Sequence, residues 1–420
     1  AQNGATVAEQ IGGQIFIDTW GLVSPGRPEL AAKMAKAAAS VTHDGNGVYG
    51  GIFVACCISI AYMERDIRAI LLGALDFIPA DCEYARAVRA VMDYHEKNPE
   101  SWRDCFSYIY ENFGYDKYPG NCHIIPNICV MILALLYGKG DFDATIEICT
   151  MCGWDTDCNV GNVAAIMGVR GGTCAIDYEK WRRPIRDLLI CSGSMGSLNI
   201  QSIPQGADYL LKMMLRLGYE LPGQWASVLS QNSRLCHFEY EGSTDCMRSR
   251  VVSALQEEQD RDGKGEGKAL LSNTDRQAHS GKRSLLIQAK QVKEAEVYQK
   301  TYYFPEDFDD SRYDPSFSPL VYPGDTLHCY VRGEKVKESN IKGEKVKAAL
   351  FARDSRSQAM VLGPEIILSD DGWTKLDFRI PSGEENEPVL ALVDEVGILL
   401  SCEEKGDFLC YLDDFYWEGG

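Results

Sequence analysis

Two aspartates separated by one residue form the part of this sequence best suited to chemistry. They lie in the run Gly153-Trp154-Asp155-Thr156-Asp157-Cys158-Asn159, between two segments with helical content. A helix start would place both carboxylates and several backbone N–H groups in one small volume. Close carboxylates are costly unless a cation or another partner offsets them, and hard oxygen ligands suit Mg²⁺ or Ca²⁺. The alternative is helix capping, because Asp and Asn are good N-cap residues.

Two histidines precede this run. His43 lies in Thr42-His43-Asp44-Gly45-Asn46-Gly47, directly after an alanine-rich segment. A histidine there can orient a substrate or cap the helix end, where an imidazolium is favoured. His123 is followed by Pro126-Asn127 and an apolar run. A lone histidine in such a place is usually a satisfied core group.

The elements that must position these residues are helical over about the first 225 residues. Apolar residues recur there at helical spacing, and strand-like alternation is absent, so we expect an all-α domain. The connections are Gly-rich, as at 43–51, 118–121 and 138–141. The expected helices cover residues 30–41, 51–63, 85–96, 124–136, 143–152, 159–167, 184–191 and 207–217.

The pattern changes after Leu221-Pro222-Gly223. Short alternating segments separated by Pro and Gly turns predict an all-β jelly-roll sandwich over residues 231–420. The chain is therefore expected to be multidomain, with an all-α domain at 1–225 followed by the sandwich. The expected strands cover 235–240, 284–287, 297–304, 326–331, 347–352, 374–380, 389–393 and 408–417.

The net charge, the apolar runs and the cysteines of the chain indicate which partners and which compartment to expect. The net charge of −19 argues against a nucleic-acid partner, and no apolar run is long enough to indicate a membrane partner. Many of the 16 cysteines lie in apolar helical runs, which indicates buried free thiols, a reducing compartment and a cytoplasmic location. Cys149 and Cys152 form a CxxC pair without a second pair at zinc spacing. We see no signal peptide, and expect that the chain is truncated ahead of Ala1.

The order of these motifs resembles the ADP-ribosylglycohydrolase family. Ser40 to Gly45, His123 to Asn127 and Gly153 to Asn159 carry the resemblance, together with Gln14 to Gly26, which contains Ile17-Asp18-Thr19-Trp20-Gly21. It covers about residues 5–225, and its most specific piece is the D-T-D-x-N segment. The resemblance implies an all-helical domain that hydrolyses glycosidic bonds to ADP-ribose and holds two divalent ions, usually Mg²⁺.

The resemblance also implies roles for individual residues. Asp155 and Asp157 would be metal ligands, and Cys158 lies where many members have a threonine ligand, although a thiol is a poor ligand for Mg²⁺. The glutamate and the Thr-Asp-Asp run that complete the family's metal site are not found. We therefore expect the helical domain to be truncated at its amino end, and no catalytic residue is assigned. The residues expected to bind or surround the substrate are His43, Gly45, Asn46, Trp20, Asp18, His123 and Asn159.

The carboxyl-side domain resembles carbohydrate-binding-module-like jelly rolls. The resemblance rests on His237-Phe238-Glu239, Ser280 to Leu285, Gly372-Trp373-Thr374 and Tyr411 to Trp417. It implies a structural Ca²⁺ held by Glu239 and Asp413, and the alternative is exposed edge-strand charge. An aromatic and acidic stretch can stack on sugars or pack into the core. Its aromatic residues are Tyr302, Tyr303, Phe304, Tyr313 and Phe317.

Together these patterns predict a metal-dependent glycosyl hydrolase that cleaves an ADP-ribosyl bond with a metal-positioned water. Its partner would be an ADP-ribosylated or other glycosidic substrate. Two alternatives stay open. The chain could hydrolyse another glycoside, or it could be a catalytically degenerate protein that binds ADP-ribose or sugar without cleaving it.

Overall fold

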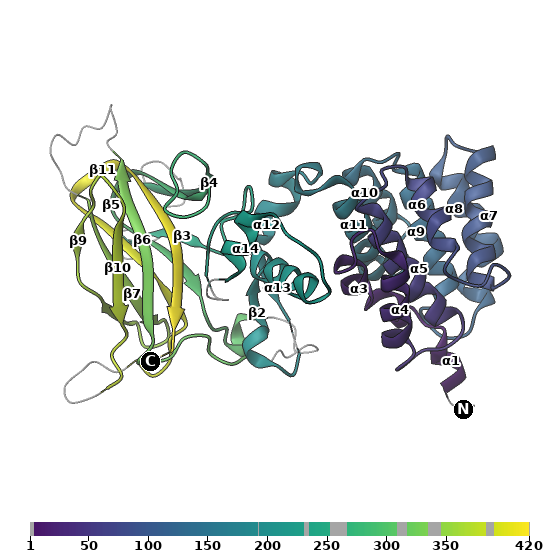
Figure 1. Cartoon of the computed structure of the whole chain (residues 1–420), viewed down its shortest axis with the longest axis horizontal. Coiled ribbons are helices and arrows are strands. Elements are labelled where there is room, and N and C mark those ends of the chain that lie inside the picture. The colour runs from purple at the N-terminus through teal and green to yellow at the C-terminus, as the bar shows by residue number, and fades with distance from the viewer. Residues whose placement is uncertain are drawn as a thin grey trace. The chain divides into compact units, whose positions relative to one another are not determined.

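The chain forms two compact units, each described here by itself (Figure 1). The helical unit comprises Ala1–Trp181 and Met213–Tyr219, and the β unit comprises Arg182–Lys212 and Glu220–Gly420. The computed structural model describes residues 4–191, 193–230, 235–252, 267–308, 317–334, 346–383 and 390–419. Tyr313 lies outside the described residues.

The helical unit confirms the expected all-α architecture of its sequence. It also contains five helices that were not expected: α1, α2 and α3, which have only four or five residues each, and the longer α6 and α8. The helices are α1 (Ala5–Ala8), α2 (Gly12–Ile15), α3 (Asp18–Leu22), α4 (Pro28–Ala39), α5 (Asn46–Ala61), α6 (Ile67–Leu75), α7 (Glu83–Lys97), α8 (Trp102–Phe113), α9 (Ile124–Tyr137), α10 (Phe142–Met151) and α11 (Thr156–Gly171).

Helix α9 forms the centre of this unit, and every residue from Ile124 to Tyr137 is buried. A helix that is apolar on all sides must be surrounded by others, and α5, α7, α8, α10 and α11 pack against it. Helix α7 shows the complementary pattern, with a buried stripe that includes Tyr84, Val88 and Val91. Among the described residues, no helix combines the length and apolarity needed to cross a bilayer.

The segment after residue 181 differs from the expected helix at 184–191. Helix α12 (Arg183–Ile185) stops at Arg186 and Asp187, which have φ values of 50° and 57°. Two successive residues in the left-handed region cannot continue a right-handed helix. The chain continues as β1 (Leu188–Ile190), which pairs antiparallel with β2 (Ile200–Ser202). Helices α13 (Ile203–Arg216) and α14 (Gly223–Ser230) follow.

The β unit confirms the expected all-β domain. Two expected strands are wrong. Residues 235–240 form only an isolated bridge, between Cys236 and Phe415. Residues 390–393 have no strand structure, and Val389 lies outside the described residues. The strands are β3 (Arg248–Val251), β4 (Lys268–Thr274), β5 (Ser284–Lys300), β6 (Thr326–Glu334), β7 (Lys347–Asp354), β8 (Ala359–Leu362), β9 (Ile366–Ile367), β10 (Thr374–Arg379) and β11 (Glu395–Glu418).

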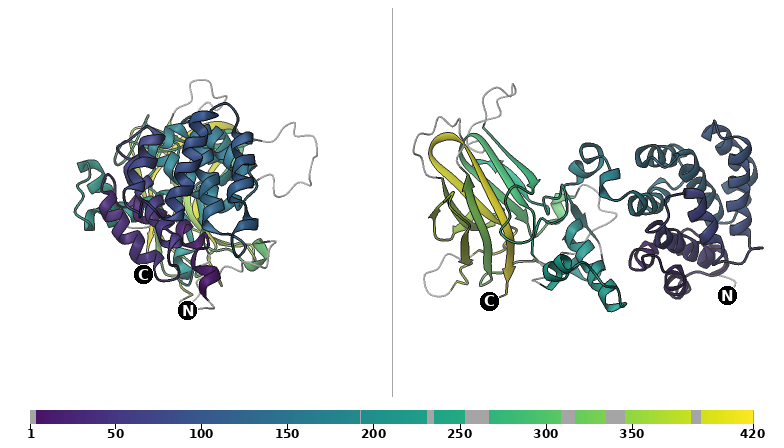
Figure 2. Two further views of the ribbon diagram at one scale, coloured as in Figure 1. Left: turned by 90° about the vertical axis from the view of Figure 1, so that its right-hand side faces the viewer. Right: turned by 45° about the horizontal axis from the view of Figure 1, so that its top comes forward.

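Two long strands, β5 and β11, run through both layers of this unit (Figures 1 and 2). Their pairing register shifts between Ser401 and Phe408, and Gln291 of β5 has a φ of 53°. On one side of this irregularity β3 and β7 flank the pair, and β8 and β9 join β7. On the other side β4 and β6 flank it, and β10 joins β6. Buried residues of both layers form one core cluster, as in a sandwich.

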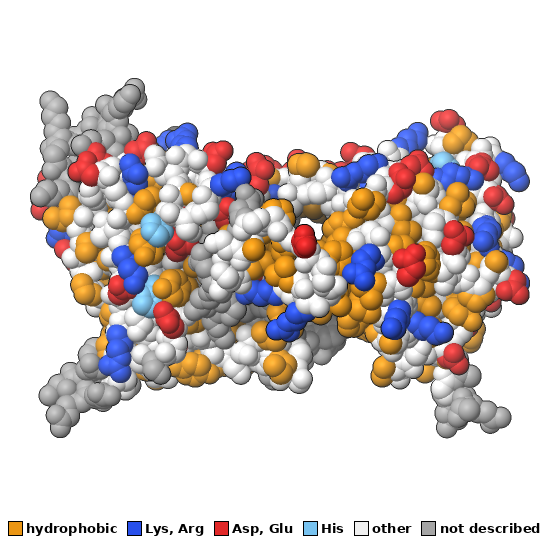
Figure 3. Space-filling model, in the orientation of Figure 1, with side chains coloured by type: hydrophobic (Ala, Val, Ile, Leu, Met, Phe, Trp, Pro, Cys, Tyr) orange, Lys and Arg blue, Asp and Glu red, His pale blue; other side chains and the backbone are white. Residues whose placement is uncertain are grey.

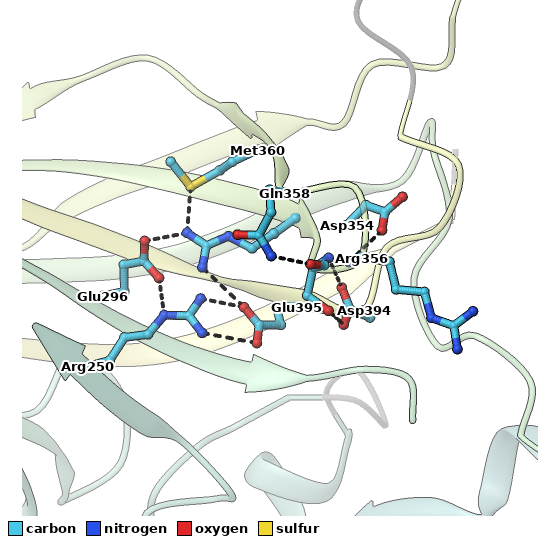
Figure 4. Close-up of polar contacts among 10 residues, drawn as sticks. Arg250, Glu296, Asp354, Arg356, Gln358, Met360, Asp394 and Glu395 are labelled. Carbon is cyan, nitrogen blue, oxygen red and sulfur yellow. Dashed lines mark hydrogen bonds and ion pairs between the residues drawn. The ribbon is translucent and has the colours of Figure 1, made fainter. Parts of the chain in front are cut away.

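A ring of alternating charges crosses one layer of the sandwich (Figure 4). Arg250 of β3 and Arg353 of β7 each contact both Glu296 of β5 and Glu395 of β11. The side chain of Glu296 is 2% exposed and that of Glu395 is 8% exposed. Burying either carboxylate alone would be costly, so the four groups depend on one another. The ring therefore ties together four strands from distant parts of the sequence.

Replacing Glu296 by Ala should lower the free energy of unfolding of the β unit by about 3 kcal/mol, because two partly buried guanidinium groups lose a partner. The matched control is Glu306→Ala, which breaks the exposed Arg356–Glu306 pair and should cost less than about 1 kcal/mol. Chemical denaturation would measure both, with hydrogen exchange in β5 and β7 assigning the transition. Equal costs for the two variants would contradict a cooperative ring.

Candidate metal and sugar sites

The run with the two aspartates forms the start of α11 and does not act as an ordinary helix cap. Asp155 occupies the N-cap position with a φ of 43°, and its side chain makes no capping hydrogen bond. A non-glycine residue in this left-handed region is strained and usually serves a local purpose. Its Oδ2 is buried without a hydrogen-bond partner. Capping therefore does not explain why an aspartate stands at this position.

Asp155, Asp157 and Cys158 each place one potential ligand atom within 4.8 Å of the others. Burial raises the pKa of Asp155, and the charge of Asp157 adds to that rise. Burial and the Asp155 charge raise the pKa of the Cys158 thiol to about 12. The proximity of two carboxylates and an unpartnered carboxylate oxygen fit a hard cation. The thiol is the weakest member of this ligand set.

Asn159 and Asn162 continue the same face of α11 into the core. Asn159 Nδ2 donates to the Trp154 carbonyl at 2.8 Å and to Asn127 Oδ1 at 2.9 Å. Asn159 Oδ1 is buried without a partner. Asn162 Nδ2 donates to Asp18 Oδ1 at 2.7 Å. These amide groups attach α11 to α9 and α3, and so fix where the carboxylates at its start lie.

Asp18 is held in a largely buried polar network. Asn162 accepts a hydrogen bond from Gln14 at 3.3 Å, and Gln14 accepts one from the hydroxyl of Tyr84 at 2.8 Å. Burial raises the pKa of Asp18 to about 7, although the Asn162 hydrogen bond opposes the rise. A carboxyl group with such a pKa can hold or release a proton near neutral pH.

A second polar group joins the loop after α4 to the start of α9. Glu9 Oε1 accepts hydrogen bonds from the backbone and side chain of Asn46, at 2.8 and 3.0 Å. Glu9 Oε2 lies 3.5 Å from His123 Nε2, and the ring of Tyr118 stacks on His123 at 4.6 Å. His123 also caps α9, because its Nδ1 accepts from the Ile125 N–H. A Cβ on Gly45 would meet Glu9 Oε1 at 2.4 Å, so glycine is required there.

His43 packs on two glycines of α2 rather than capping α4 with its ring. A Cβ on Gly12 or Gly13 would lie 3.0 Å from the imidazole. The ring Nδ1 is 2.7 Å from Thr42 Oγ1, and burial lowers the pKa of His43. Trp20 is half-buried and packs against the helical core. Within the described chain, no hydrogen bond joins His43 to Asp155 or Asp157.

The structure thus divides the expected site residues into neighbouring groups. Asp155, Asp157, Cys158 and Asn159 form one group, Asp18 belongs to the Asn162 network, and Asn46 and His123 are joined through Glu9. The partners that make these links were not expected at the site, although Gln14 and Asn127 lie in the motifs of the resemblance, because each link forms only when helices distant in sequence meet. Those partners are Glu9, Gln14, Tyr84, Asn127 and Asn162.

In the β unit, the two residues expected to hold calcium bind backbone N–H groups. Glu239 Oε1 accepts from Lys282 and Arg283 at 2.8 and 2.9 Å. Asp413 Oδ2 accepts from the His279 N–H at 2.7 Å. Burial and the neighbouring Asp414 raise the pKa of Asp413 to about 8. Both carboxylates thus hold the segment that leads into β5, and a bound Ca²⁺ stays a prediction.

A separate pocket of about 370 Å³ lies on the outer face of the layer that contains β6. Arg332, Gly333 and Glu334 of β6 and Tyr411 of β11 line it, while Val331 and Leu412 beside them belong to the core. Arg332 donates to Gln277 Oε1 at 3.1 Å, and Tyr411 donates to Glu334. Flat rings lie beside this polar lining, at Trp373, His279 and Tyr330.

The aromatic stretch expected near residue 302 is mainly a packing cluster. Tyr303 is buried and accepts a hydrogen bond from Arg248 at 2.8 Å. Phe308 stacks on Phe317 with ring centroids 5.7 Å apart, and Tyr303 contacts both rings. The plainer of the two interpretations, core packing, therefore accounts for these residues.

A comparison with protein families agrees with the helical part of this description. The family model described as ADP-ribosylglycohydrolase matches residues 1–216, about half of the chain. A comparison with curated proteins finds no match.

Solved carbohydrate-binding modules resemble the carboxyl-side part of the chain. One solved structure comes from work on the promiscuous specificity of carbohydrate-binding modules of the β-sandwich superfamily. It matches this chain at 14% sequence identity and a TM-score of 0.29, and the match covers 43% of this chain and 60% of that chain. The CBM22-1 xylan-binding domain from Paenibacillus barcinonensis Xyn10C matches at 17% identity and a TM-score of 0.26, covering 43% and 90%. The C-terminal family 22 module of Clostridium thermocellum Xyn10B matches at 14% and 0.27, covering 44% and 91%.

The raised pKa of Asp18 predicts a pH-dependent stability of the helical unit. The folded state keeps this proton up to about pH 7, whereas an ordinary aspartate releases it near 3.8. The free energy of unfolding should therefore fall as the pH rises from about 4 to 7. Asp18→Asn keeps the shape and removes the titration, so its stability should fall less over that range. Urea unfolding in chelator, with the exposed Asp93→Asn as control, would measure this; parallel curves for wild type and Asp18→Asn would contradict it.

Proposed function

The chain belongs to the ADP-ribosylglycohydrolase family, and we propose that it hydrolyses a glycosidic bond to an ADP-ribosyl group with a divalent cation held at the start of α11. The observation that carries the proposal is the buried, unpartnered oxygen of Asp155 beside the carboxylate of Asp157. A lone buried carboxylate oxygen is unfavourable in a folded protein unless a ligand supplies its partner. A cation satisfies both carboxylates at once.

Mg²⁺ bound there would polarise a sugar oxygen and lower the pKa of a water molecule. The residues of the chain supply its setting. Asp155 and Asp157 carry the charge, while Asn159 and Asn162 fix the helix that presents them. Carboxylate ligands of this number leave several positions of an octahedral ion for water and ribose hydroxyls. The family resemblance adds a second ion, for which we propose the same class of oxygen ligands.

The remaining polar groups would bind and orient the substrate. Glu9 holds Asn46 and His123 in place through its two oxygens. His43 lies against α2 with its ring partly exposed, and the side chain of Phe16, 75% exposed, is near the same glycine. Imidazole and phenyl faces can pack on a sugar or a base, and amide groups can bond to hydroxyls. Such a lining suits a ribosyl substrate with an attached planar group.

The metal proposal is tested by calorimetry with Mg²⁺ on the full chain. The Asp155→Asn, Asp157→Asn double variant should bind Mg²⁺ at least about tenfold more weakly. The reason is that replacing residues that only hydrogen-bond to metal ligands already lowers metal affinity by about that factor. Asparagine tolerates the left-handed backbone of residue 155. The matched control is Asp141→Asn, because Asp141 does cap α10, at 2.8 Å from the Ala144 N–H. An unchanged affinity in the double variant would contradict a metal site here.

Release of ADP-ribose from an ADP-ribosylated peptide then distinguishes the remaining alternatives. Turnover that needs Mg²⁺ and is lost in the double variant supports hydrolysis of this bond. Tight ADP-ribose binding without turnover would identify a degenerate binding protein. Turnover of another glycoside, with ADP-ribose neither bound nor released, would replace the proposed substrate while keeping the reaction class.

The pocket on β6 and β11 supports a second function, the binding of a neutral oligosaccharide by the β unit. Aromatic faces stack on sugar rings, and guanidinium and carboxylate groups bond to hydroxyls. Arg332 and Glu334 line the pocket, and the ring of Trp373 lies beside it, with its centroid 6.4 Å from that of Tyr411. The hydrogen bonds from Arg332 to Gln277 and to the Asp370 carbonyl hold its guanidinium in place before a ligand arrives.

Affinity electrophoresis against a panel of neutral polysaccharides tests this second function. Trp373→Ala should weaken binding about fivefold for any polysaccharide that retards the wild type, since stacking contributes about 1 kcal/mol per ring contact. The control is Tyr322→Ala, which removes an aromatic side chain that is 51% exposed and, among the described residues, contacts neither Tyr411 nor the pocket lining. Retardation that is unchanged in Trp373→Ala would place the sugar elsewhere.

A further inference from the structure

The helical unit contains a second pocket, of about 510 Å³, that takes no part in the proposed reaction. It is formed by the start of α6, by the ends of α7, α9 and α11, and by the short loops beside them. The residues that matter here are Arg65, Arg68, His95, Lys139, Gly140 and Arg170.

This pocket lies at the far ends of the helices that carry the metal site. Asp155 and Arg170 stand at the two ends of α11, and His123 and Leu136 at the two ends of α9. At 1.5 Å per residue these ends are about 20 Å apart. A ligand in the pocket therefore would not compete with a substrate at the start of α11.

The pocket is lined by an excess of positive charge, although the chain as a whole carries a negative net charge. The chain has a net charge of −19, and on the face drawn in Figure 3 acidic and basic side chains are interspersed. Four cationic side chains line the pocket against two carboxylates, those of Asp66 and Glu96. Glu96 pairs with Arg68, and Asp66 Oδ1 accepts from the Ala69 N–H at 2.7 Å. The pocket keeps a cationic excess.

Arg170 holds the pocket in shape. Its Nε donates to the Arg65 carbonyl, and its Nη1 donates to the Gly140 carbonyl at 2.9 Å. Gly140 has a φ of +80°, and a Cβ there would lie 2.8 Å from Arg170 Nη2. Glycine is thus required for the guanidinium to lie against this loop. Neither contact neutralises the charge of Arg170, because both acceptors are carbonyl groups.

Helix dipoles explain only part of this arrangement. Cations are favourable at the ends of α7, α9 and α11, and Arg170, Lys139 and His95 fit that explanation. Arg65 and Arg68 lie at the start of α6, where a positive charge is unfavourable and where Asp66 caps the N–H of Ala69 but leaves the N–H groups of Ile67 and Arg68 uncapped. Cations placed beside a helix N-terminus suit a bound anion, which both would stabilise.

The positive charges around the pocket also affect the imidazole of His95. Burial lowers the pKa of its imidazole, and the charges of Arg68 and Lys139 lower it further. The ring lies in the pocket and contacts Tyr137 edge-on, with centroids 4.7 Å apart. Apolar groups of Leu136 and Pro99 form the rest of the wall. The pocket therefore combines cationic side chains, which can bind an anion, with apolar side chains, which can contact a larger group attached to that anion.

We propose that this pocket binds the phosphate group of a small molecule, held by Arg65, Arg68, Lys139 and the N–H groups in the first turn of α6 that Asp66 does not cap. A phosphate dianion takes several charge-assisted hydrogen bonds at once, as this set of donors can supply. The volume exceeds that of a phosphate ion, so a phosphate monoester with a sugar-sized remainder fits the pocket better than the free ion.

The test follows the imidazole resonances of the full chain by NMR while inorganic phosphate, glucose 6-phosphate or glucose is added at constant ionic strength. The His95 resonance should shift with both phosphates and not with glucose, and a His95→Gln variant assigns it. Stronger binding of glucose 6-phosphate would identify a monoester as the ligand class. Stronger binding of inorganic phosphate would identify the free ion.

The Arg65→Gln, Lys139→Gln double variant should bind phosphate roughly tenfold or more weakly, because each cation contributes a charge-assisted hydrogen bond. The matched control is Lys97→Gln, an exposed cation on the same helix as His95 that does not line the pocket. Binding should also survive in the Asp155→Asn, Asp157→Asn variant, so this outcome is independent of the proposed metal site.

The proposal is overturned if neither phosphate shifts the His95 resonance of the wild-type chain. It is equally overturned if the double variant, with an unchanged circular dichroism spectrum, binds as tightly as the control. Should the double variant lose its helical signal, Arg65→Gln alone decides, since that side chain is exposed and only its backbone carbonyl is bonded to Arg170.

Discussion

The buried amide groups of α11 are the constraint on which the helical unit depends. Asn159 and Asn162 lie in a mainly apolar core, and each must find a partner on another helix. Their partners on α9 and α3 fix both the rotation and the height of α11. Because Asp155 precedes these residues by one and two turns, satisfying the amides also places the carboxylates. The geometry of the candidate metal site is thus a consequence of hydrogen bonding in the core.

In the β unit, ion pairs rather than amide hydrogen bonds fix how the elements align. Its two longest strands cross both layers, so a shift of register in either would turn core residues outward. The ring of Arg250, Glu296, Arg353 and Glu395 links four strands by ion pairs that are satisfied only in one alignment. Partly buried ion pairs add little net stability but penalise every arrangement that separates them. The ring thus favours one register of the sandwich.

Helix ends do most of the chemistry that we propose for the helical unit. The starts of α9 and α11 carry His123 and Asp155, and the opposite ends of the same helices form the cationic pocket. The partial positive charge at a helix start favours carboxylates and the partial negative charge at a helix C-terminal end favours cationic side chains, so it is these side chains, not the helix ends themselves, that would bind a ligand of opposite charge. Helices packed side by side collect these groups at two places. Two binding sites at opposite ends of one bundle follow from that packing.

The sequence by itself determined the two fold classes and the residues around Asp155. Helical periodicity, the change of pattern after residue 222 and the D-T-D-x-N run are local properties of the chain, readable without any contact. The helix expected at 184–191 was wrong because two residues there, Arg186 and Asp187, adopt left-handed conformations that composition does not reveal. The long strand β5 was expected only as two short segments, and of β11 only residues 408–417 were expected.

Only the tertiary structure decided which polar residues share a site. Glu9 and Asn46 are 37 residues apart, and Asp18 and Asn162 are 144 apart, so no local pattern could pair them. It also showed that Asp155 does not cap its helix, a choice the sequence had left open. The cationic pocket was invisible in the sequence, because its residues come from four segments that converge only when the helices pack. Local preference selects elements, whereas the satisfaction of buried polar groups selects how those elements meet.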